Sequence, residues 1–323
     1  MPTISIILPV CNGARYLEQA LDSLRLQRGG LDDVEIIATD DNSTDASPAI
    51  LAAATAALPL RVIPGANRGN WVASTNLALA CASGDFVCFL HQDDRFLPDK
   101  IATLLAAAKA QPDAHVFAHA SAFIDSTGRR VGTWKFPAPT RRLSPAAWLP
   151  PLLVQNNLAV PAVMFRRALR DSVGQLDESL RYTADWDFWL KLAKHHDLVH
   201  LPACLAEYRL HREAQTVGFA EKQTEYAENL RRVLARHLGA LDTLDLREAA
   251  AFRAMANLGV TINLWLASRI TARPLPLGTL VGAFCRAGVC NALRYLRLSR
   301  IGSRTLARLR ARIHVPLPPQ DHP

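Results

Sequence analysis

The chain has 323 residues, of which 50% are hydrophobic and 20% are charged. This length suits one large domain or one domain with a substantial appendage, and the composition excludes a disordered chain. Between residues 249 and 320 there are eleven arginines and no Asp, Glu or Lys, so this stretch contributes +11 and the remainder −3 to the net charge of +8. A basic tail on a slightly acidic body predicts contact with an anionic surface, whereas nucleic-acid binding would favour a uniformly basic surface.

The first half of the sequence alternates apolar, β-rich runs with helical patterns. Strands are predicted at residues 4–10, 34–39, 60–63, 86–90 and 115–123, with helices near residues 14–27, 44–58, 71–82 and 99–110. Successive strands start about 30 residues apart, the size of one βαβ unit. The short, continuous apolar strands predict a mostly parallel α/β sheet with helices on both faces.

The second half begins with an irregular stretch at residues 126–160, within which a helix is predicted at 145–154. Residues 185–196 are typical of a helix with a polar start and an apolar stripe, in which Trp186 and Trp189 are expected to pack in the core. A platform that stacks on a sugar is the alternative for these two tryptophans. After residue 221 the pattern is almost wholly helical. We therefore predict a domain of residues 1–220, with halves 1–125 and 126–220, and a helical, arginine-rich region of residues 221–323.

The cysteines and the N-terminal residues indicate the cellular compartment in which the protein is expected. The six cysteines show no CxxC pair and no regular spacing; they are Cys11, Cys81, Cys88, Cys204, Cys285 and Cys290. This usage is typical of reduced, mostly buried thiols of a cytoplasmic protein. The first residues continue directly into a predicted strand without a basic and then apolar leader, so we expect no secretory signal.

Polar residues follow three of the predicted strands, in the segments 9–13, 40–45 and 91–94. In open α/β sheets, ligands bind at the carboxyl ends of the strands. Two of these segments carry adjacent carboxylates, which repel each other unless a cation or a hydrogen-bonding ligand joins them. Oxygen ligands favour Mg²⁺ or Mn²⁺. A simple Asx turn and helix N-cap is the alternative interpretation of segment 40–45.

Six short segments, taken in order, resemble glycosyltransferase family 2. They are residues 5–12, 40–45, 67–69 with Asn76, 92–94, 184–189 and 208–211. Each segment is weak alone, and their order makes the resemblance specific across residues 3–215. It implies the GT-A fold, in which a nucleotide-binding α/β half adjoins a smaller acceptor-binding half.

The resemblance also implies a donor site. The residues expected to contact a nucleotide-sugar donor are Pro9, Cys11, Asn12, Asp40, Asp41, Asn67, His91 and Gln92. The position of Cys11 is often aromatic in the family, which puts base stacking in doubt. His91 stands where the family usually has an acidic residue, so the ribose contact normally made there must differ.

A divalent metal, Mg²⁺ or Mn²⁺, is implied by the same resemblance. Asp93 matches the second acid of the DxD motif and is expected to bind the metal, with Asp94 supporting the site. His211 resembles a histidine that closes the metal site in some members, although a lone histidine can equally be structural.

Asp185 matches the general base of the family. One carboxylate that takes the proton of the acceptor hydroxyl, without a second nucleophilic carboxylate, implies single displacement with inversion. The alternative for Asp185 is a helix N-cap, a place for which Thr183 competes. Asp187 lies two residues further along and is expected to face away, as a cap or an acceptor contact.

The expected function is thus a metal-dependent, inverting transfer of a sugar from a nucleotide-sugar donor to a hydroxyl of a glycan or lipid-linked acceptor. A role in bacterial surface polysaccharide synthesis is implied by the family alone. A nucleotidyltransferase and a non-catalytic sugar-nucleotide-binding scaffold remain alternatives, and the second is permitted by His91. A dinucleotide oxidoreductase fits poorly because no GxGxxG follows the first strand.

The C-terminal stretch predicts a peripheral contact with the cytoplasmic face of a membrane. Its charge-free runs at residues 254–268 and 274–285 are shorter than the ~20 residues of a spanning helix. Arg297, Arg300, Arg304 and Arg308 occur at helical spacing beside apolar residues, as in a basic amphipathic helix on anionic lipid. The alternative is an arginine-rich helix packed on the catalytic body or at a dimer contact.

Overall fold

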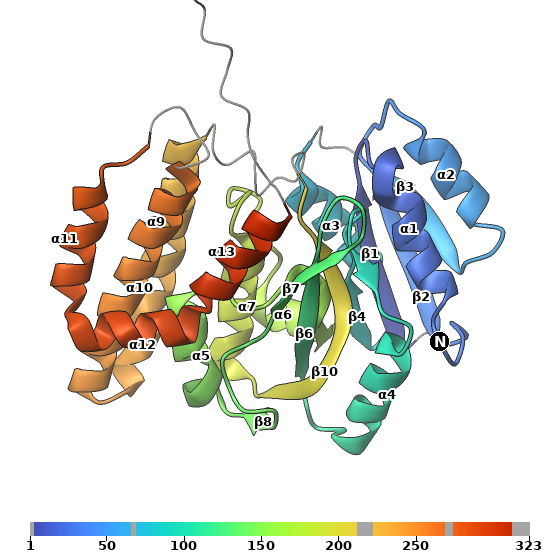
Figure 1. Ribbon diagram of the computed structural model, residues 1–323. Coiled ribbons are helices and arrows are strands. Elements are labelled where there is room, and N and C mark those ends of the chain that lie inside the picture. Colours follow the sequence, from blue (N-terminus) through green and yellow to red (C-terminus); the bar gives the residue numbers. More distant parts are fainter. Residues whose placement is uncertain (1–2, 66–68, 212–221, 269–273, 312–323) are drawn as a thin grey trace, which may run out of the picture.

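The computed structural model describes residues 3–65, 69–211, 222–268 and 274–311, which form one mixed sheet flanked by helices (Figure 1). The strands of its main path follow the order β3-β2-β1-β4-β9-β6-β10-β5, with β7 paired to β6 and β8 to β10. The ten strands are β1 (Ile4–Val10), β2 (Val34–Asp40), β3 (Leu60–Pro64), β4 (Phe86–Phe89), β5 (Arg95–Phe96), β6 (Val116–Ile124), β7 (Arg130–Trp134), β8 (Arg142–Leu143), β9 (Val163–Arg166) and β10 (Leu198–Arg209).

The N-terminal half of the sheet is the parallel α/β unit that the sequence predicts. β1 pairs in parallel with β2 and β4, and β2 pairs in parallel with β3. The crossover helices are α1 (Ala14–Arg25), α2 (Ser47–Ala54) and α3 (Trp71–Ala80). Parallel strands need such crossovers, and their carboxyl ends consequently meet at one edge of the sheet. The predicted α/β class, with parallel strands in this half of the sheet, is therefore confirmed.

The other half of the sheet is mixed. β9 lies between β4 and β6 and runs antiparallel to both, whereas β6 and β10 are parallel to each other. The predicted strand at residues 115–123 is present as β6, yet it does not pair with β4 as the continuation of a parallel sheet would. Because β9 is antiparallel to β4, its start lies near the carboxyl end of β4, so the segment before it, with Asn156 and Val160, reaches the edge where β1 and β4 end.

Side chains of the central strands alternate between two apolar layers. Ile6 and Leu8 of β1 pack against α1, α2 and α4 (Lys100–Ala110), while Ile7 faces the opposite layer. This alternation is the period of two of a β-strand, with both faces covered. Because both layers are apolar, side chains on both faces of each strand are apolar, and the strands are continuous apolar runs in the sequence.

The opposite layer is extended by helices from the whole second half of the chain. They are α5 (Pro145–Val154), α6 (Leu169–Val173), α7 (Ala184–His195), α9 (Gln223–His237), α10 (Leu246–Ser268), α11 (Leu277–Ala287), α12 (Val289–Ser299) and α13 (Ile301–Arg310). The all-helical character of the described C-terminal region is confirmed. Phe252 and Met255 of α10 belong to the same apolar cluster as Trp148 and Trp189, so these helices share one core with the α/β part. The predicted boundary at residue 220 lies outside the described residues.

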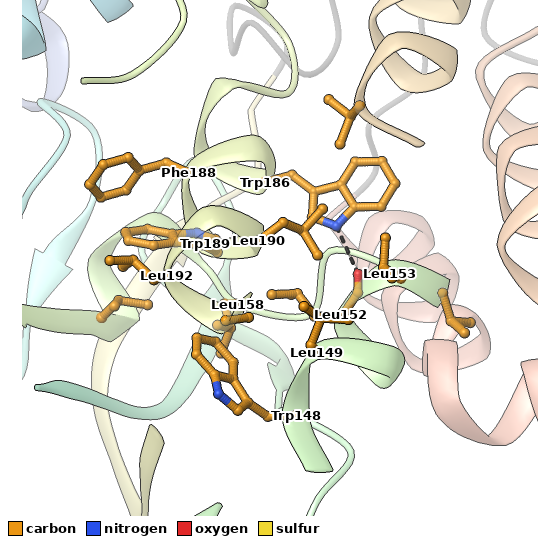
Figure 2. Packing of buried hydrophobic residues seen from close by; sticks show 14 of the residues in the cluster. Trp148, Leu149, Leu152, Leu153, Leu158, Trp186, Phe188, Trp189, Leu190 and Leu192 are labelled. Carbon is orange, nitrogen blue, oxygen red and sulfur yellow. Dashed lines mark hydrogen bonds between the residues drawn. The ribbon is translucent and has the colours of Figure 1, made fainter. Parts of the chain in front are cut away.

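The two tryptophans of α7 pack in this core, as predicted (Figure 2). Trp189 is fully buried, and Trp186 is 4% exposed. The indole Nε1 of Trp186 donates a hydrogen bond to the backbone oxygen of Leu152, at 2.8 Å, which ties α7 to α5. This bond satisfies the polar atom of a side chain that otherwise lies among leucines.

The predicted amphipathic helix at the C-terminus is interrupted, which corrects the interpretation of its arginines. Arg300 adopts φ 52° and ψ 24°, so α12 ends at Ser299 and α13 begins at Ile301 in a new direction. A residue in this left-handed region breaks the helical repeat. Arg297, Arg300, Arg304 and Arg308 therefore do not form one continuous stripe toward a lipid surface.

The six cysteines are free thiols, as predicted, but most of them are not buried. Cys88 is buried, Cys285 and Cys290 are exposed, and the others are intermediate. The prediction of mostly buried thiols is wrong because α11 and α12 present their cysteines on the outside of the molecule. Within the described residues no helix is both long and apolar enough to span a membrane.

Candidate active site

A cavity of about 390 Å³ opens where β1 and β4 end and where α7 and the C-terminal helices approach them. Of the residues predicted for the site, those that line this cavity are Pro9, Cys11, Asp41, His91, Gln92, Asp93, Asp185 and His211. Asn12, Asp40 and Asp94 lie beside it without lining it, and Asn67 lies outside the described residues. The structure thus brings the predicted donor, metal and base residues to one place.

Asn12 and Asp40 hold together the loops that follow β1 and β2. The side-chain oxygen of Asn12 accepts a hydrogen bond from the backbone N–H of Thr44 at 2.8 Å, and Asn12 N donates to Ser43 Oγ at 2.9 Å. Asp40 Oδ1 accepts from the backbone N–H of Ser43 at 3.3 Å. Asn42, Ser43 and Thr44 do not cap α2, whose N-cap is Ala46 without a side-chain bond, and the Asx-type bond of this loop comes from Asp45, whose Oδ1 accepts from the backbone N–H of Ser47 at 2.9 Å. The carboxylate of Asp41 faces the cavity.

Asp41 is buried at the wall of the cavity, and its Oδ2 accepts a hydrogen bond from the backbone N–H of Gly69 at 2.6 Å. The backbone at Gly65 passes so close to Asp41 that a Cβ on Gly65 would lie 2.7 Å from the Cα of Asp41. The thiol of Cys11 lies 3.6 Å from the backbone oxygen of Asp41. Burial, together with the neighbouring carboxylates, raises the pKa of the Cys11 thiol, which keeps it neutral at this wall.

Gln92 extends the pairing of β1 and β4 beyond the last strand residues. Its Oε1 accepts from the backbone N–H of Cys11 at 2.8 Å, and its Nε2 donates to the backbone oxygen of Cys11 at 3.1 Å. A Cβ at Gly13 would overlap the Gln92 side chain, so a glycine is required at this close approach. Gln92 therefore positions the Cys11 backbone at the wall of the cavity.

His91, Asp93 and Asp94 bring one ligand atom each within 4.8 Å of one another. His211, from the end of β10, adds its Nε2 at 2.8 Å from Asp93 Oδ2. The Nε2 atom of His91 and the Oδ2 atom of Asp94 are buried without a hydrogen-bond partner. Buried polar atoms without partners are rare in native proteins, and here two of them lie in a cluster with the composition of a cation site.

The electrostatics of this cluster favour the protonation states that a metal needs. Burial lowers the pKa of His91, which keeps the imidazole neutral, the form in which histidine binds metals. Burial opposes ionisation of Asp93, but the hydrogen bond from His211 and the nearby histidines outweigh it and lower the pKa of Asp93. Asp93 is thus an anion between two imidazoles.

Asp94 occupies a different environment from its neighbour. It is 1% exposed, and its Oδ1 accepts a hydrogen bond from the backbone N–H of Arg209 at 2.9 Å. Burial and the adjacent charge of Asp93 raise the pKa of Asp94 well above its usual range. Arg209 also donates from Nε to the backbone oxygen of Asp93 at 2.8 Å, so this arginine holds the 91–94 segment against β10. This role of Arg209 was not identified from the sequence.

Asp185 lies in the first turn of α7 and faces the cavity. The helix N-cap is Thr183, so Asp185 is not the cap. Asn156 donates a hydrogen bond from Nδ2 to Asp185 Oδ2 at 2.8 Å. Burial raises the pKa of Asp185 to about 6 even though this hydrogen bond opposes the rise. A carboxylate with a pKa near the working pH is suited to accept a proton.

Comparison with known proteins identifies the family. The sequence profile of glycosyl transferase family 2 matches residues 5–171, more than half of the chain. The chain belongs to glycosyl transferase family 2. An uncharacterised glycosyltransferase of Rickettsia typhi is 26% identical over 71% of this chain and 70% of its own length. The uncharacterised glycosyltransferase YwdF of Bacillus subtilis is 29% identical over 70% of this chain and 82% of its own length.

Solved structures show the same fold. S. aureus TarS 1-349 in complex with UDP-GlcNAc aligns with a TM-score of 0.65 and 19% identity, covering 97% of this chain and 90% of TarS 1-349. The mannosyltransferase PcManGT of Pyrobaculum calidifontis, in complex with GDP-Man and Mn²⁺, aligns with a TM-score of 0.55 and 16% identity, covering 95% and 87%. The GT-A fold of this glycosyltransferase is therefore established.

In this glycosyltransferase Asp187 points away from the cavity, as predicted from its spacing to Asp185. Its carboxylate is fully buried and pairs with Lys191 and Arg236 at 2.9 Å, and His237 Nε2 lies 2.8 Å from Asp187 Oδ1. Burial alone would raise the pKa of Asp187, but the contacts with His237 and Lys191 lower it to about 2. Asp187 joins α7 to α9 and is neither a helix cap nor an acceptor contact.

The far wall of the cavity comes from the C-terminal helices of the glycosyltransferase, which sequence analysis did not place at the site. Tyr226 of α9, Asn263 of α10 and Arg304 and Arg308 of α13 line it. The guanidinium of Arg304 stacks over the Trp134 ring at 4.6 Å and donates to the backbone oxygen of Asn156 at 3.1 Å. The sequence pointed to these residues only through the helical spacing of the arginines between 297 and 308. That spacing predicted a contact with lipid instead of a cavity wall.

Proposed function

We propose that this glycosyltransferase is metal-dependent and inverting, and that it moves a sugar from a nucleotide-sugar donor to a hydroxyl of a glycan or lipid-linked acceptor. The observation that carries the proposal is that the half-buried carboxylate of Asp185 lines the same cavity as His91, Asp93 and His211. A base and a cation site in one cavity are what a reaction with a hydroxyl nucleophile and a diphosphate leaving group requires.

The donor is proposed to occupy the end of the cavity formed by Pro9, Cys11 and Asp41, with Asn12, Asp40 and Gln92 shaping its wall. Asn67 remains a predicted contact. The complexes of TarS with UDP-GlcNAc and of PcManGT with GDP-Man, which share the fold, support a nucleotide-sugar as donor. Cys11 is a small residue, so the nucleoside base would contact a thiol and a proline here instead of an aromatic ring.

The residues that would hold a divalent ion are His91, Asp93 and His211, with Asp94 behind them. The partnerless atoms of His91 and Asp94 fit such an ion. When bound, the ion would neutralise charge on the diphosphate leaving group. Because Mg²⁺ takes oxygen ligands whereas imidazole suits transition metals, we favour Mn²⁺ over Mg²⁺.

The proposed base works through Asp185 and Asn156. Asn156 fixes the carboxylate by donating to Oδ2, so that Asp185 is held ready to take the proton of the acceptor hydroxyl. As the acceptor oxygen forms its bond to the anomeric carbon, the bond from that carbon to the diphosphate oxygen breaks and the proton moves to Asp185. The other candidate carboxylate of this helix, Asp187, is committed to ion pairs, which supports a single displacement with inversion.

Two alternatives from the sequence are less well supported. A non-catalytic sugar-nucleotide-binding scaffold has no use for a carboxylate whose pKa is raised toward neutrality in the cavity, yet Asp185 is such a group. A nucleotidyltransferase would need a glycine-rich phosphate loop with a basic residue after β1. Here Gly13 instead accommodates the Gln92 side chain.

The experiment that tests the proposal combines binding and product analysis. UDP-, GDP- and dTDP-sugars are screened for hydrolysis with Mn²⁺, with Mg²⁺ and with chelator, and nucleoside diphosphates are screened by thermal shift. We expect one nucleotide to raise the melting temperature only with metal, and the same donor to be consumed. Metal-independent consumption, or a product sugar with retained anomeric configuration, would contradict the proposal.

We further propose that the glycosyltransferase rests on the cytoplasmic face of a membrane through the outer surface of α11 and α12. Exposed apolar side chains on these helices are Leu277, Val281, Val289, Leu293 and Leu296. Arg286 and Arg297 are exposed beside them, and neither helix contains an acidic residue. An anionic lipid surface matches this chemistry, with about 1 kcal/mol available per arginine. A surface-polysaccharide role remains a prediction from the family.

Flotation with vesicles tests this contact in the full-length protein. Removing the C-terminal helices is unsuitable, since they share the core of the molecule. The double variant Leu277→Ser, Leu293→Ser changes only exposed side chains and should stop flotation with phosphatidylglycerol vesicles at low salt. Wild type should float with these vesicles and not with phosphatidylcholine alone. A variant that floats like wild type would remove the proposal.

A further inference from the structure

Two arginines of α13 line the cavity on the side of the proposed base. Arg304 and Arg308 are four residues apart, so they lie on one face of the helix. Tyr226 of α9 lines the same wall. Figure 1 shows how this is possible, because α13 leaves the outer helices and runs back over β7.

At this point α13 packs against β7. A Cβ on Gly132 of β7 would lie 2.9 Å from the Cβ of Ala307, so the helix and the strand are in direct contact. Arg304 is held from two sides, by the ring of Trp134 and by the backbone oxygen of Asn156. The side chain of Asn156 in turn donates a hydrogen bond to Asp185. Asn156 therefore links Arg304 to the proposed base.

The two guanidinium groups place like charges on one wall of the cavity. In the described part of the chain, neither Arg304 nor Arg308 forms an ion pair with a carboxylate. Burial and, to a smaller extent, the charge of Arg308 lower the pKa of Arg304 to about 10. The last turn of a helix favours a cation such as Arg308, but Arg304 lies further inside α13. Two half-buried like charges that face one cavity indicate an anionic ligand.

We propose that Arg304 and Arg308 bind a phosphate group carried by the acceptor, next to the hydroxyl that Asp185 deprotonates. This inference rests on the proposed function and adds a chemical class to its acceptor. A phosphate monoester carries about −1.5 to −2 charges at pH 7, which matches two guanidinium groups better than a single carboxylate does. Guanidinium groups also fit phosphate oxygens through paired N–H donors.

The contacts of Arg304 differ from those of the residues proposed to face the donor diphosphate. The cation cluster that would face the diphosphate consists of His91, Asp93 and Asp94, with His211 beside Asp93. Arg304 instead contacts Asn156 and Trp134, on the side of the base. An acceptor approaches the base, so its own charged group would meet the arginines.

Isothermal titration of inorganic phosphate into the full-length protein tests the subsite. The titration is made after saturation with Mn²⁺ and whichever of UDP or GDP raises the melting temperature, so that the donor end is filled. We expect phosphate to bind with the nucleotide present, Arg308→Gln to weaken this binding at least tenfold, and Arg308→Lys to retain part of it. Arg310→Gln, an exposed arginine of the same helix outside the cavity, is the matched control and should bind phosphate like wild type.

Several results would overturn the assignment. If the nucleoside diphosphate blocks phosphate binding, the arginines belong to the donor site. If Arg308→Gln binds phosphate as wild type does, the pair is not the subsite, and if acetate binds as tightly as phosphate, the acceptor group is a carboxylate. Failure of the proposed function appears separately, as absence of any metal-dependent thermal shift with nucleoside diphosphates.

Discussion

The substitution Asp185→Asn separates the proposed catalytic role of this side chain from a structural one. It replaces one carboxylate oxygen by an amide NH₂ and keeps the shape, so the remaining oxygen can still accept from Asn156 Nδ2. Only the basicity is removed. We expect turnover to fall by about 10²-fold or more, the usual scale for a lost general base, while donor binding stays nearly normal.

The same substitution should stabilise the protein at neutral pH. Burial raises the pKa of Asp185 from 3.8 to about 6, and each unit corresponds to about 1.4 kcal/mol, giving an upper bound of about 3 kcal/mol for the cost of ionising it in the folded state. Because the side chain is only partly buried, we expect about 1–2 kcal/mol, or a few degrees in melting temperature. The folded pKa is raised, so this cost is absent below about pH 4 and complete above about pH 6.

The assay is a pair of measurements on wild type and variant: turnover, and melting temperature at pH 4 and pH 7.5. Asp187→Asn is the contrasting control, since it breaks buried ion pairs and should lower the melting temperature at pH 7.5. A fall in turnover of less than tenfold would assign the base elsewhere. A melting temperature of Asp185→Asn that equals wild type at both pH values would refute the pKa argument.

Four further outcomes are expected. Asp93→Ala should abolish transfer and weaken nucleotide binding in the presence of Mn²⁺. If the nucleotide affinity of the variant equals that of wild type both with and without Mn²⁺, Asp93 is not a metal ligand. His91→Asp should leave activity intact or raise it, and complete loss would show that the histidine has a role of its own. Wild-type kcat/KM for the acceptor should fall as pH drops through about 6, because Asp185 becomes protonated. Asn156→Ala, which removes a hydrogen bond that favours the charged form, should shift that fall to higher pH.

The sequence by itself determined the parallel α/β half and the edge of the sheet at which most of the proposed donor residues lie. The strands at 4–10, 34–40, 60–64 and 86–89 are encoded by continuous apolar runs, and their regular spacing requires crossover helices. Parallel strands end at the same edge, so the polar residues after β1, β2 and β4 had to meet there. The helix that carries Asp185 and the core positions of Trp186 and Trp189 also followed from local periodicity.

Only the tertiary structure decided what faces these residues. The pairing of Asn156 with Asp185, the antiparallel insertion of β9 and the return of α13 to the cavity join segments that are 29 to 148 residues apart. Local patterns carry no signal for such contacts. Arg304 shows the physical reason most clearly: its helical spacing to Arg297 and Arg300 predicted a shared exposed face, but the left-handed turn at Arg300 redirected the chain and placed the guanidinium between Trp134 and the base.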